Sequence, residues 1–257
     1  MATEKSMRAP LTVSFLLALA LGATTALAAD ATLSPAEKSA GWRMLFDGKT
    51  RNGWTGMKGT PFPAKSWVIE DGMIRTTEDG SDGDVVTTKP FDNFELVFEY
   101  RLAKGGNSGV KYGVQQEWLS PHWTPEAPAR FKADQAIAAV GYEFQIYDDD
   151  TLERKPGWEL SSTGALYLLE APRNKKVNKP GEWNSARVVV NGKHVEHWLN
   201  GSKLLEYELS SGELLAKVEK TKFRKVPGYG QKAPGYIVLQ HHGSPAWFRN
   251  IKIREIQ

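Results

Sequence analysis

Hydrophobic and polar residues alternate strictly along residues 141–147, which read Gly-Tyr-Glu-Phe-Gln-Ile-Tyr. Successive side chains of a β-strand point to opposite faces of a sheet, so this pattern predicts a strand with one apolar face. The apolar face carries Tyr142, Phe144 and Ile146. The opposite face carries Glu143, Gln145 and Tyr147, and so presents a carboxylate beside an amide.

A second alternating segment lies near the C-terminus, at residues 236–243, and its predicted strand spans 236–241. Ile237 and Leu239 suit a buried face, whereas Gln240 and His242 share the opposite face. Two strands with polar faces of this kind predict a functional site where the fold brings them together.

Short alternating runs of the same type recur along the rest of the chain. Turn dipeptides such as Asn191-Gly192 and Asn200-Gly201 separate them. Many short strands with little helix predict an all-β protein, a β-sandwich or jelly roll of two antiparallel sheets. The remaining predicted strands span residues 67–70, 72–75, 94–102, 108–114, 165–169, 186–190, 194–199 and 247–255.

Two segments interrupt this rhythm. Residues 115–140 are rich in Pro and Trp, and they predict a long loop insertion or a short helix over one end of the sandwich. Residues 210–225 predict one short helix, with Ser210 or Ser211 as its N-cap and Glu213 in its first turn.

The N-terminal segment has the three parts of a secretory signal peptide. Lys5 and Arg8 precede an apolar run from Leu11 to Leu21, and Ala26-Leu-Ala28 is an Ala-x-Ala cleavage pattern. The apolar run is too short to cross a bilayer, and no Cys follows it to carry a lipid. We therefore predict a signal peptide at residues 1–28, no membrane anchor, and secretion to a bacterial periplasm.

Composition narrows the class of protein further. The chain has no Cys, so an exported domain must be held together by its core and not by disulfides. The formal net charge is +3, with basic residues scattered among acids, which argues against a nucleic-acid partner. Because no linker divides the chain, we predict a lead-in at residues 29–40 and a single domain at 41–257. The sequence gives no indication of the oligomeric state.

An ordered set of motifs covers nearly all of the chain after residue 40. The motifs are 45–49 with Gly53-Trp54, 67–72, 106–109, 141–145, 164–167, 181–184, 198–201, 239–243 and 248–251. Through these motifs the chain resembles the 3-keto-disaccharide hydrolase domain family. That family's fold is similar to the concanavalin A-like lectin and glucanase sandwich, so the resemblance implies a jelly roll with carbohydrate on one sheet face. One departure is His241, which stands where the family often has Asp.

The resemblance implies an enzyme that cleaves glycosides already oxidised to a ketone at C3, so the expected partner is an oxidised carbohydrate. A C3 ketone acidifies the proton on C2, which allows a base to remove it and the C1 substituent to leave by β-elimination. Water then adds back to complete a net hydrolysis. Such a site needs a base, a group that stabilises the enolate, and an acid for the leaving oxygen.

Within this chemistry each polar strand residue receives a predicted role. Glu143 is the first candidate for the base, and His242 is the second candidate for base or acid because its pKa can lie near neutral pH. Asn107, Gln145 and Gln240 are predicted to orient the sugar hydroxyls or the enolate oxygen, and Lys111 to add a positive charge. Tyr147 and Trp123 complete the predicted substrate-binding set.

A divalent cation bound by Glu143 and His242 is the alternative enolate stabiliser. The spacing of these ligands is not a metal signature, so the sequence assigns no cofactor and the choice between Lys111 and a cation stays open. The run Asp148–Asp150 predicts a solvated loop, with a calcium site as the lesser alternative.

Two classes of function remain at this point. A glucanase of this fold would carry closely spaced acids on one strand, whereas here Gln145 follows Glu143, so the two-carboxylate mechanism lacks its partner. This pattern argues against ordinary hydrolysis and is compatible with elimination, which needs only one base. The alternative is a non-catalytic carbohydrate-binding module of the same sandwich type, which predicts an aromatic platform with no titrating group. A separate, plainer reading of Glu143 is that it is a solvated residue on an exposed sheet face.

Overall fold

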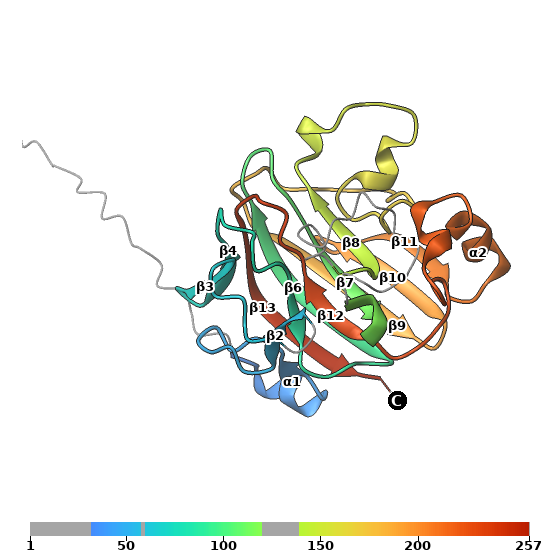
Figure 1. Ribbon diagram of the computed structural model, residues 1–257. Helices are drawn as coiled ribbons and strands as arrows, with labels where there is room; N and C mark the ends of the chain where they lie inside the picture. The colour runs from blue at the N-terminus through green and yellow to red at the C-terminus, as the bar shows by residue number, and fades with distance from the viewer. Residues whose placement is uncertain (1–31, 58–59, 120–138, 257) are drawn as a thin grey trace, which may run out of the picture.

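The computed structural model describes residues 32–57, 60–119 and 139–256. In this part of the chain two antiparallel β-sheets pack face to face, with little helix (Figure 1). The predicted all-β sandwich is confirmed. The predicted signal peptide at 1–28 lies outside the described residues, as do Trp123 and most of the predicted insertion at 115–140.

The larger sheet has eight strands in the order β11-β10-β9-β6-β13-β4-β3, with β1 paired to β13. Its strands are β1 (Arg43–Met44), β3 (Trp67–Glu70), β4 (Met73–Thr76), β6 (Phe94–Leu102), β9 (Asn184–Asn191), β10 (His194–Leu199), β11 (Ser202–Glu208) and β13 (Ala246–Glu255). The alternation of the sequence did not predict β11, because Leu204 and Leu205 are adjacent and both buried. A β-bulge opposite them between His197 and Trp198 allows both to face inward.

The smaller sheet has five strands in the order β2-β5-β12-β7-β8. Its strands are β2 (Trp54–Gly56), β5 (Val85–Thr87), β12 (Tyr236–Leu239), β7 (Asn107–Val114) and β8 (Tyr142–Tyr147). The sequence did not predict β2 and β5, because three residues are too few to show a period. The register of β7 against β8 sets Lys111 opposite Glu143.

The core lies between the two sheets and is built by alternate residues of the facing strands. Phe144 of β8 meets Phe98 of β6 edge to face, with their ring centroids 5.7 Å apart. His197 is also inside, where its Nε2 pairs with the Tyr112 hydroxyl at 2.6 Å and its Nδ1 donates to the Gly164 carbonyl at 3.0 Å. Burial lowers the pKa of His197 to about 4, so this imidazole is neutral at neutral pH.

Residues 165–169 do not form the predicted strand. The segment turns instead. Leu168 has a positive φ of 64°, a backbone conformation that residues other than glycine adopt uncommonly. Its backbone nevertheless bonds to the outer edge of β8, because the Tyr167 N–H donates to the Glu143 carbonyl at 3.1 Å. The segment therefore covers the edge of the smaller sheet without extending it.

The predicted helix at residues 210–225 is shorter than expected. Helix α2 (Gly212–Val218) begins at the N-cap Ser211, whose hydroxyl accepts from the Leu214 N–H at 3.1 Å, and it lies beside β11 (Figure 1). A second short helix, α1 (Pro35–Ser39), lies in the predicted lead-in and is closed by a capping box between Ser34 and Glu37. The 3-10 turns are η2 (Gln116–Leu119), η3 (Asp149–Thr151), η4 (Trp158–Ser161) and η5 (Lys222–Lys225). Among the described residues, no helix has the length and apolar character needed to span a membrane.

Candidate active site

Polar side chains gather on the outer face of the smaller sheet, the face turned away from the core. Glu143 and Gln145 lie there on β8, Lys111 lies opposite Glu143 on β7, and Gln240 directly follows β12. The structure thus brings together the two polar strand faces that the sequence singled out. The reading of Glu143 as a solvated residue is wrong, because only 7% of it is exposed.

A glycine makes room for the Glu143 carboxylate. A Cβ atom built on Gly109 of β7 would lie 2.3 Å from Glu143 Oε1, closer than any real contact. The carboxylate therefore rests against the bare backbone of the neighbouring strand. This close packing fixes its position and excludes water from one side of it.

Glu143, Lys111 and Gln240 form one contiguous polar group. With its amide nitrogen turned toward Glu143 and its amide oxygen toward Lys111, Gln240 donates to Glu143 Oε1 and accepts from Lys111 Nζ, both at 3.2 Å. Burial raises the pKa of the Glu143 carboxyl above its usual range, and the Lys111 and Lys222 ammonium groups oppose this shift. A carboxylate with a raised pKa is a stronger base than an exposed one.

A second buried carboxylate, which the sequence reading missed, holds Lys111 in place. Asp84 is fully buried, lies 3.3 Å from Lys111 Nζ, and also accepts from the backbone N–H groups of Ala139 and His241 at 3.0 and 2.8 Å. Lys111 completes its contacts by donating to the Ala139 carbonyl at 2.8 Å. The only sequence signal was an acid directly before the apolar residues 85–86, and such a position is common in turns.

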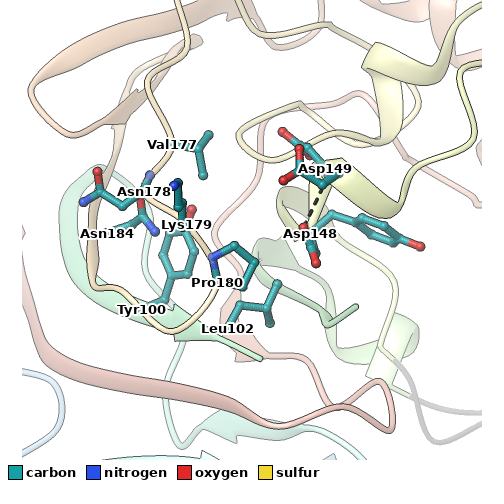
Figure 2. Close-up of a pocket in the computed structure, with 11 residues that line it drawn as sticks. Tyr100, Leu102, Asp148, Asp149, Val177, Asn178, Lys179, Pro180 and Asn184 are labelled. Carbon is teal, nitrogen blue, oxygen red and sulfur yellow. Dashed lines mark hydrogen bonds between the residues drawn. The ribbon is translucent and has the colours of Figure 1, made fainter. Parts of the chain in front are cut away.

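The two other predicted amides lie further along the same face. Gln145 donates to the Asn107 side-chain oxygen at 3.3 Å, and Tyr147, at the end of β8, is half-buried. Tyr147 and Asp148 line a pocket at this end of the sandwich, across which Asp149 faces Asn178 and Asn184 (Figure 2). Gln145 is buried, whereas Asn107 and Tyr147 are half-buried, and of these three side chains only Tyr147 lines the pocket.

The aspartates after β8 bind the protein's own groups. Asp148 accepts from the Gly105 N–H at 2.7 Å, whereas Asp149 accepts from the Thr163 N–H at 2.9 Å and pairs with Lys175 at 2.5 Å. These contacts close the loops around the end of β8. They give Asp148 and Asp149 a structural role in place of the predicted solvated loop.

The two consecutive histidines after β12 have different environments. His241 is buried, donates from Nε2 to the Thr77 carbonyl at 3.0 Å and accepts from the Gly243 N–H at 3.1 Å, so its ring is a structural part of the loop. Burial lowers the pKa of His241 and keeps it neutral. His242 is exposed, and its ring makes no hydrogen bond to any residue that the structure describes.

Two further groups near Glu143 were not predicted. Tyr167 lies beside β8, because its N–H donates to the Glu143 carbonyl. Lys222 of η5 places its Nζ 4.9 Å from the centroid of the Tyr167 ring. Tyr167 belongs to one of the sequence motifs, but the segment was predicted as an ordinary strand. Lys222 lies far from β8 in the sequence and no pattern connects the two.

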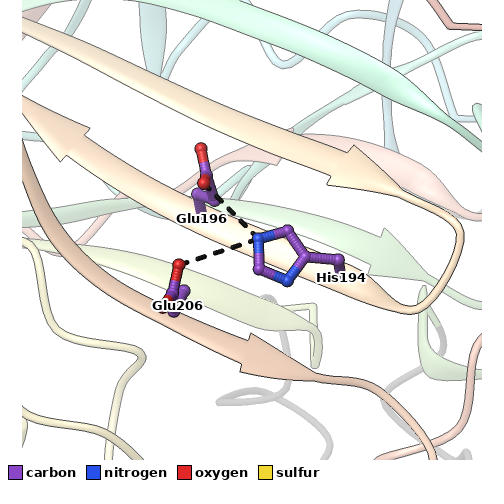
Figure 3. Close-up of side chains that lie close together, drawn as sticks. All are labelled: His194, Glu196 and Glu206. Atoms are coloured by element: carbon purple, nitrogen blue, oxygen red, sulfur yellow. Dashed lines mark hydrogen bonds and ion pairs between the residues drawn. The ribbon is translucent and has the colours of Figure 1, made fainter.

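Across the described ranges, one group of three His, Asp or Glu side chains has ligand atoms close enough to share a metal ion, and it lies elsewhere. His194, Glu196 and Glu206 form it on the outer face of the larger sheet (Figure 3). Lys203 already places its ammonium 3.3 Å from Glu196 and 2.5 Å from Glu206, so these side chains form an ion-pair network. Glu143 and His242 belong to no such group, and the predicted cation between them stays a prediction.

Two facing antiparallel sheets with a buried carboxylate on one outer face define a β-sandwich that carries a candidate active site on a sheet face. Residues 41–254 match the model of the 3-keto-alpha-glucoside-1,2-lyase-like domain, and the chain belongs to this family. A 3-keto-disaccharide hydrolase of Bacteroides thetaiotaomicron is 32% identical over 237 residues, which cover 83% of this chain and 78% of the relative. The alternative of a non-catalytic binding module is therefore set aside.

Solved structures agree with this assignment. A putative glycosyl hydrolase of Parabacteroides distasonis is 32% identical, with a TM-score of 0.72 over 89% of this chain and 100% of the other. A second putative glycosyl hydrolase of that organism is 26% identical, with a TM-score of 0.58 over 84% of this chain and 99% of the other.

Proposed function

We propose that this enzyme hydrolyses 3-keto-disaccharides and related 3-keto-glycosides by removing the C2 proton and eliminating the C1 substituent, followed by hydration. The observation that carries the proposal is the buried Glu143 carboxylate held against Lys111 and Gln240. The B. thetaiotaomicron relative, named a 3-keto-disaccharide hydrolase, supports the same substrate class.

Glu143 acts as the base in this proposal. Its raised pKa makes it a better acceptor for the C2 proton, which the neighbouring ketone has made acidic. An ordinary glycosidase needs a second carboxylate across the glycosidic bond. Gln145 occupies the next position on this face, and Asp84 is fully buried and bound to Lys111 and two N–H groups, so neither serves as that partner.

Lys111 and Gln240 stabilise the enolate oxygen that forms when the proton leaves. The buried Lys111 ammonium group lies 3.3 Å from the Asp84 carboxylate, and a group held in place before the reaction needs no reorganisation during it. We prefer Lys111 to a divalent cation bound by Glu143 and His242, since the lysine already lies beside the carboxylate. Asn107, Gln145 and Tyr147 then orient the sugar hydroxyls further along the face.

The test compares a 3-keto-disaccharide with its unoxidised parent, incubated with the purified protein while the released sugar is followed by chromatography. Cleavage is expected only of the ketone. Glu143→Gln should lower the rate by about 10²–10⁴-fold, the usual contribution of a general base. Glu153→Gln, which changes an exposed loop carboxylate, is the matched control and should keep full activity. Comparable cleavage of the unoxidised parent would refute the elimination mechanism.

A chelation experiment separates the two ways of stabilising the enolate. If Lys111 stabilises the enolate, turnover should be unchanged after exhaustive dialysis against a chelator. The Lys111→Met variant should then have no turnover. Loss of activity on chelation, restored by a divalent ion, would instead assign the role to a cation.

We also propose that the enzyme is exported to a bacterial periplasm. The charged, apolar and Ala-x-Ala parts of residues 1–28 support this location. Expression of the whole chain in a Gram-negative host, followed by N-terminal sequencing of the periplasmic fraction, should give a chain that begins at Ala29. A full-length chain retained in the cytoplasm would contradict it.

A further inference from the structure

The acid that protonates the leaving oxygen is still unassigned, and the surroundings of Tyr167 point to this residue. Tyr167 directly borders Glu143, because its N–H donates to the Glu143 carbonyl at the outer edge of β8. Lys222 Nζ lies 4.9 Å from the Tyr167 ring centroid and also acts electrostatically on the Glu143 carboxylate. A carboxylate, a phenol and an ammonium group therefore share one corner of the smaller sheet.

The backbone around Tyr167 is held in an unusual conformation. Leu168 has a positive φ of 64°, in the left-handed region that a leucine rarely adopts. Hydrogen bonds maintain it, since the Leu168 N–H donates to the Leu160 carbonyl at 2.8 Å and the Leu169 N–H donates to the Leu166 carbonyl at 2.8 Å. Such conformations persist where the surrounding structure over-determines them, and they cluster at functional sites.

The Tyr167 hydroxyl keeps its proton at neutral pH. Partial burial raises the pKa of Tyr167 above its usual range, and the negative charge of Glu143 raises it further. The nearby Lys222 ammonium would stabilise a phenolate that forms during a reaction. A protonated phenol beside a cation is suited to give up its proton once a strong base develops next to it.

We propose that Tyr167 is the general acid of the elimination, donating its proton to the glycosidic oxygen as the C1–O bond breaks. This assignment rests on the proposed function. In the elimination, Glu143 takes the C2 proton and the electron pair passes to the enolate. The ketone then re-forms, a C1=C2 double bond appears, and the leaving alcohol departs with the Tyr167 proton.

The hydration step restores both groups. A water molecule adds its oxygen to C1 and gives one proton to the Tyr167 phenolate, while the C2 position recovers its proton from Glu143. The sum is one glycoside and one water converted to an alcohol and a 3-keto sugar. No oxidant or further reactant is required.

The experiment varies the leaving group, because an acidic leaving group needs no proton from the enzyme. Tyr167→Phe and the wild type are compared on a 3-keto-disaccharide and on the 3-keto-glucoside of 4-nitrophenol. We expect Tyr167→Phe to lose about 10²–10⁴-fold in kcat on the disaccharide and less than tenfold on the nitrophenyl glycoside. Exchange of the C2 proton of a 3-keto sugar with deuterated water, followed by NMR, should continue in this variant because Glu143 is intact.

Tyr236→Phe, a half-buried tyrosine at the start of β12, is the matched control and should leave all three readouts unchanged. Equal losses on both substrates in Tyr167→Phe would show that the residue positions the substrate and is not the acid. His242→Ala is the second arm, and a loss confined to the disaccharide in that variant alone would assign the acid to His242 and overturn the proposal. A wild-type protein that neither cleaves the two 3-keto substrates nor exchanges the C2 proton would refute the proposed function itself.

Discussion

The most informative stability experiment removes the buried carboxylate behind the active-site lysine. Asp84 is fully buried and Lys111 is 3% exposed, and their charged atoms lie 3.3 Å apart. Removing one partner of a buried ion pair leaves the other charge uncompensated, which costs about 3–5 kcal/mol. The N–H groups of Ala139 and His241 bind different oxygens of Asp84, and Asp84→Asn keeps an acceptor for only one of them, so we expect a loss near the upper limit, about 5 kcal/mol.

A double-variant cycle gives the sharper result. Lys111→Met alone should also destabilise the fold, because Asp84 then remains as a buried anion. When both changes are combined, neither charge remains, and the double variant should lose at least 1 kcal/mol less than the sum of the single losses. The free energies of unfolding come from denaturant titrations at pH 7, fitted with a common slope for all four proteins.

The outcome that refutes this reasoning is additivity. If the two single losses sum to the double loss within about 0.5 kcal/mol, Asp84 and Lys111 are energetically independent and Asp84 does not hold the lysine. A loss below about 1 kcal/mol for Asp84→Asn would likewise mean that water reaches the pair.

Three further predictions concern single side chains. Gly109→Ala should displace the Glu143 carboxylate, whose Oε1 lies 2.3 Å from the added Cβ, and lower kcat by about 10²-fold, whereas Gly212→Ala, with no atom within 4 Å, should leave kcat unchanged. Because Glu143 has a raised pKa and must be ionised to act, the rate should fall with decreasing pH at a midpoint above 4.5, and a midpoint at or below that value would contradict its burial. The folded-state pKa of His197 lies near 4 against 6.5 when unfolded, so the folded state binds fewer protons in that range and should lose about 3 kcal/mol of stability as the pH falls from 6.5 to 4. Denaturant titrations at these two pH values should show a smaller difference in unfolding free energy for His197→Asn than for the wild type.

The alternation of the sequence predicted the sandwich because most of its strands are long enough to show a period. It also placed Glu143 and Gln145 on one polar face and Gln240 on another, since a strand fixes the direction of every second side chain, and it predicted a site where the fold brings these faces together. It could not predict Asp84 or Lys222. Their proximity to Lys111 and Glu143 depends on which strands and loops become neighbours, and no local pattern encodes that.

The segment at 165–169 shows why a correct motif can be given the wrong structure. Its run Ala-Leu-Tyr-Leu-Leu has the composition of a strand, and its backbone does bond to β8. The pairing fails to continue because Leu168 turns the chain after Tyr167. Propensity favoured a strand here, whereas the tertiary contacts of Leu160 and Leu166 selected a turn.

Strand β8 lies at the border of its sheet, yet its backbone is bonded on both sides. On one side it pairs with β7, and on the other the Gln145 and Tyr147 N–H groups donate to the Ala165 carbonyl and the Thr163 hydroxyl, at 3.1 and 2.8 Å. A border strand of this kind should exchange its amide hydrogens with solvent as slowly as an interior one, since opening it requires the covering segment to detach first. Slow amide exchange at Gln145 and Tyr147 would thus show that Glu143 and the segment that carries Tyr167 belong to one cooperative unfolding unit.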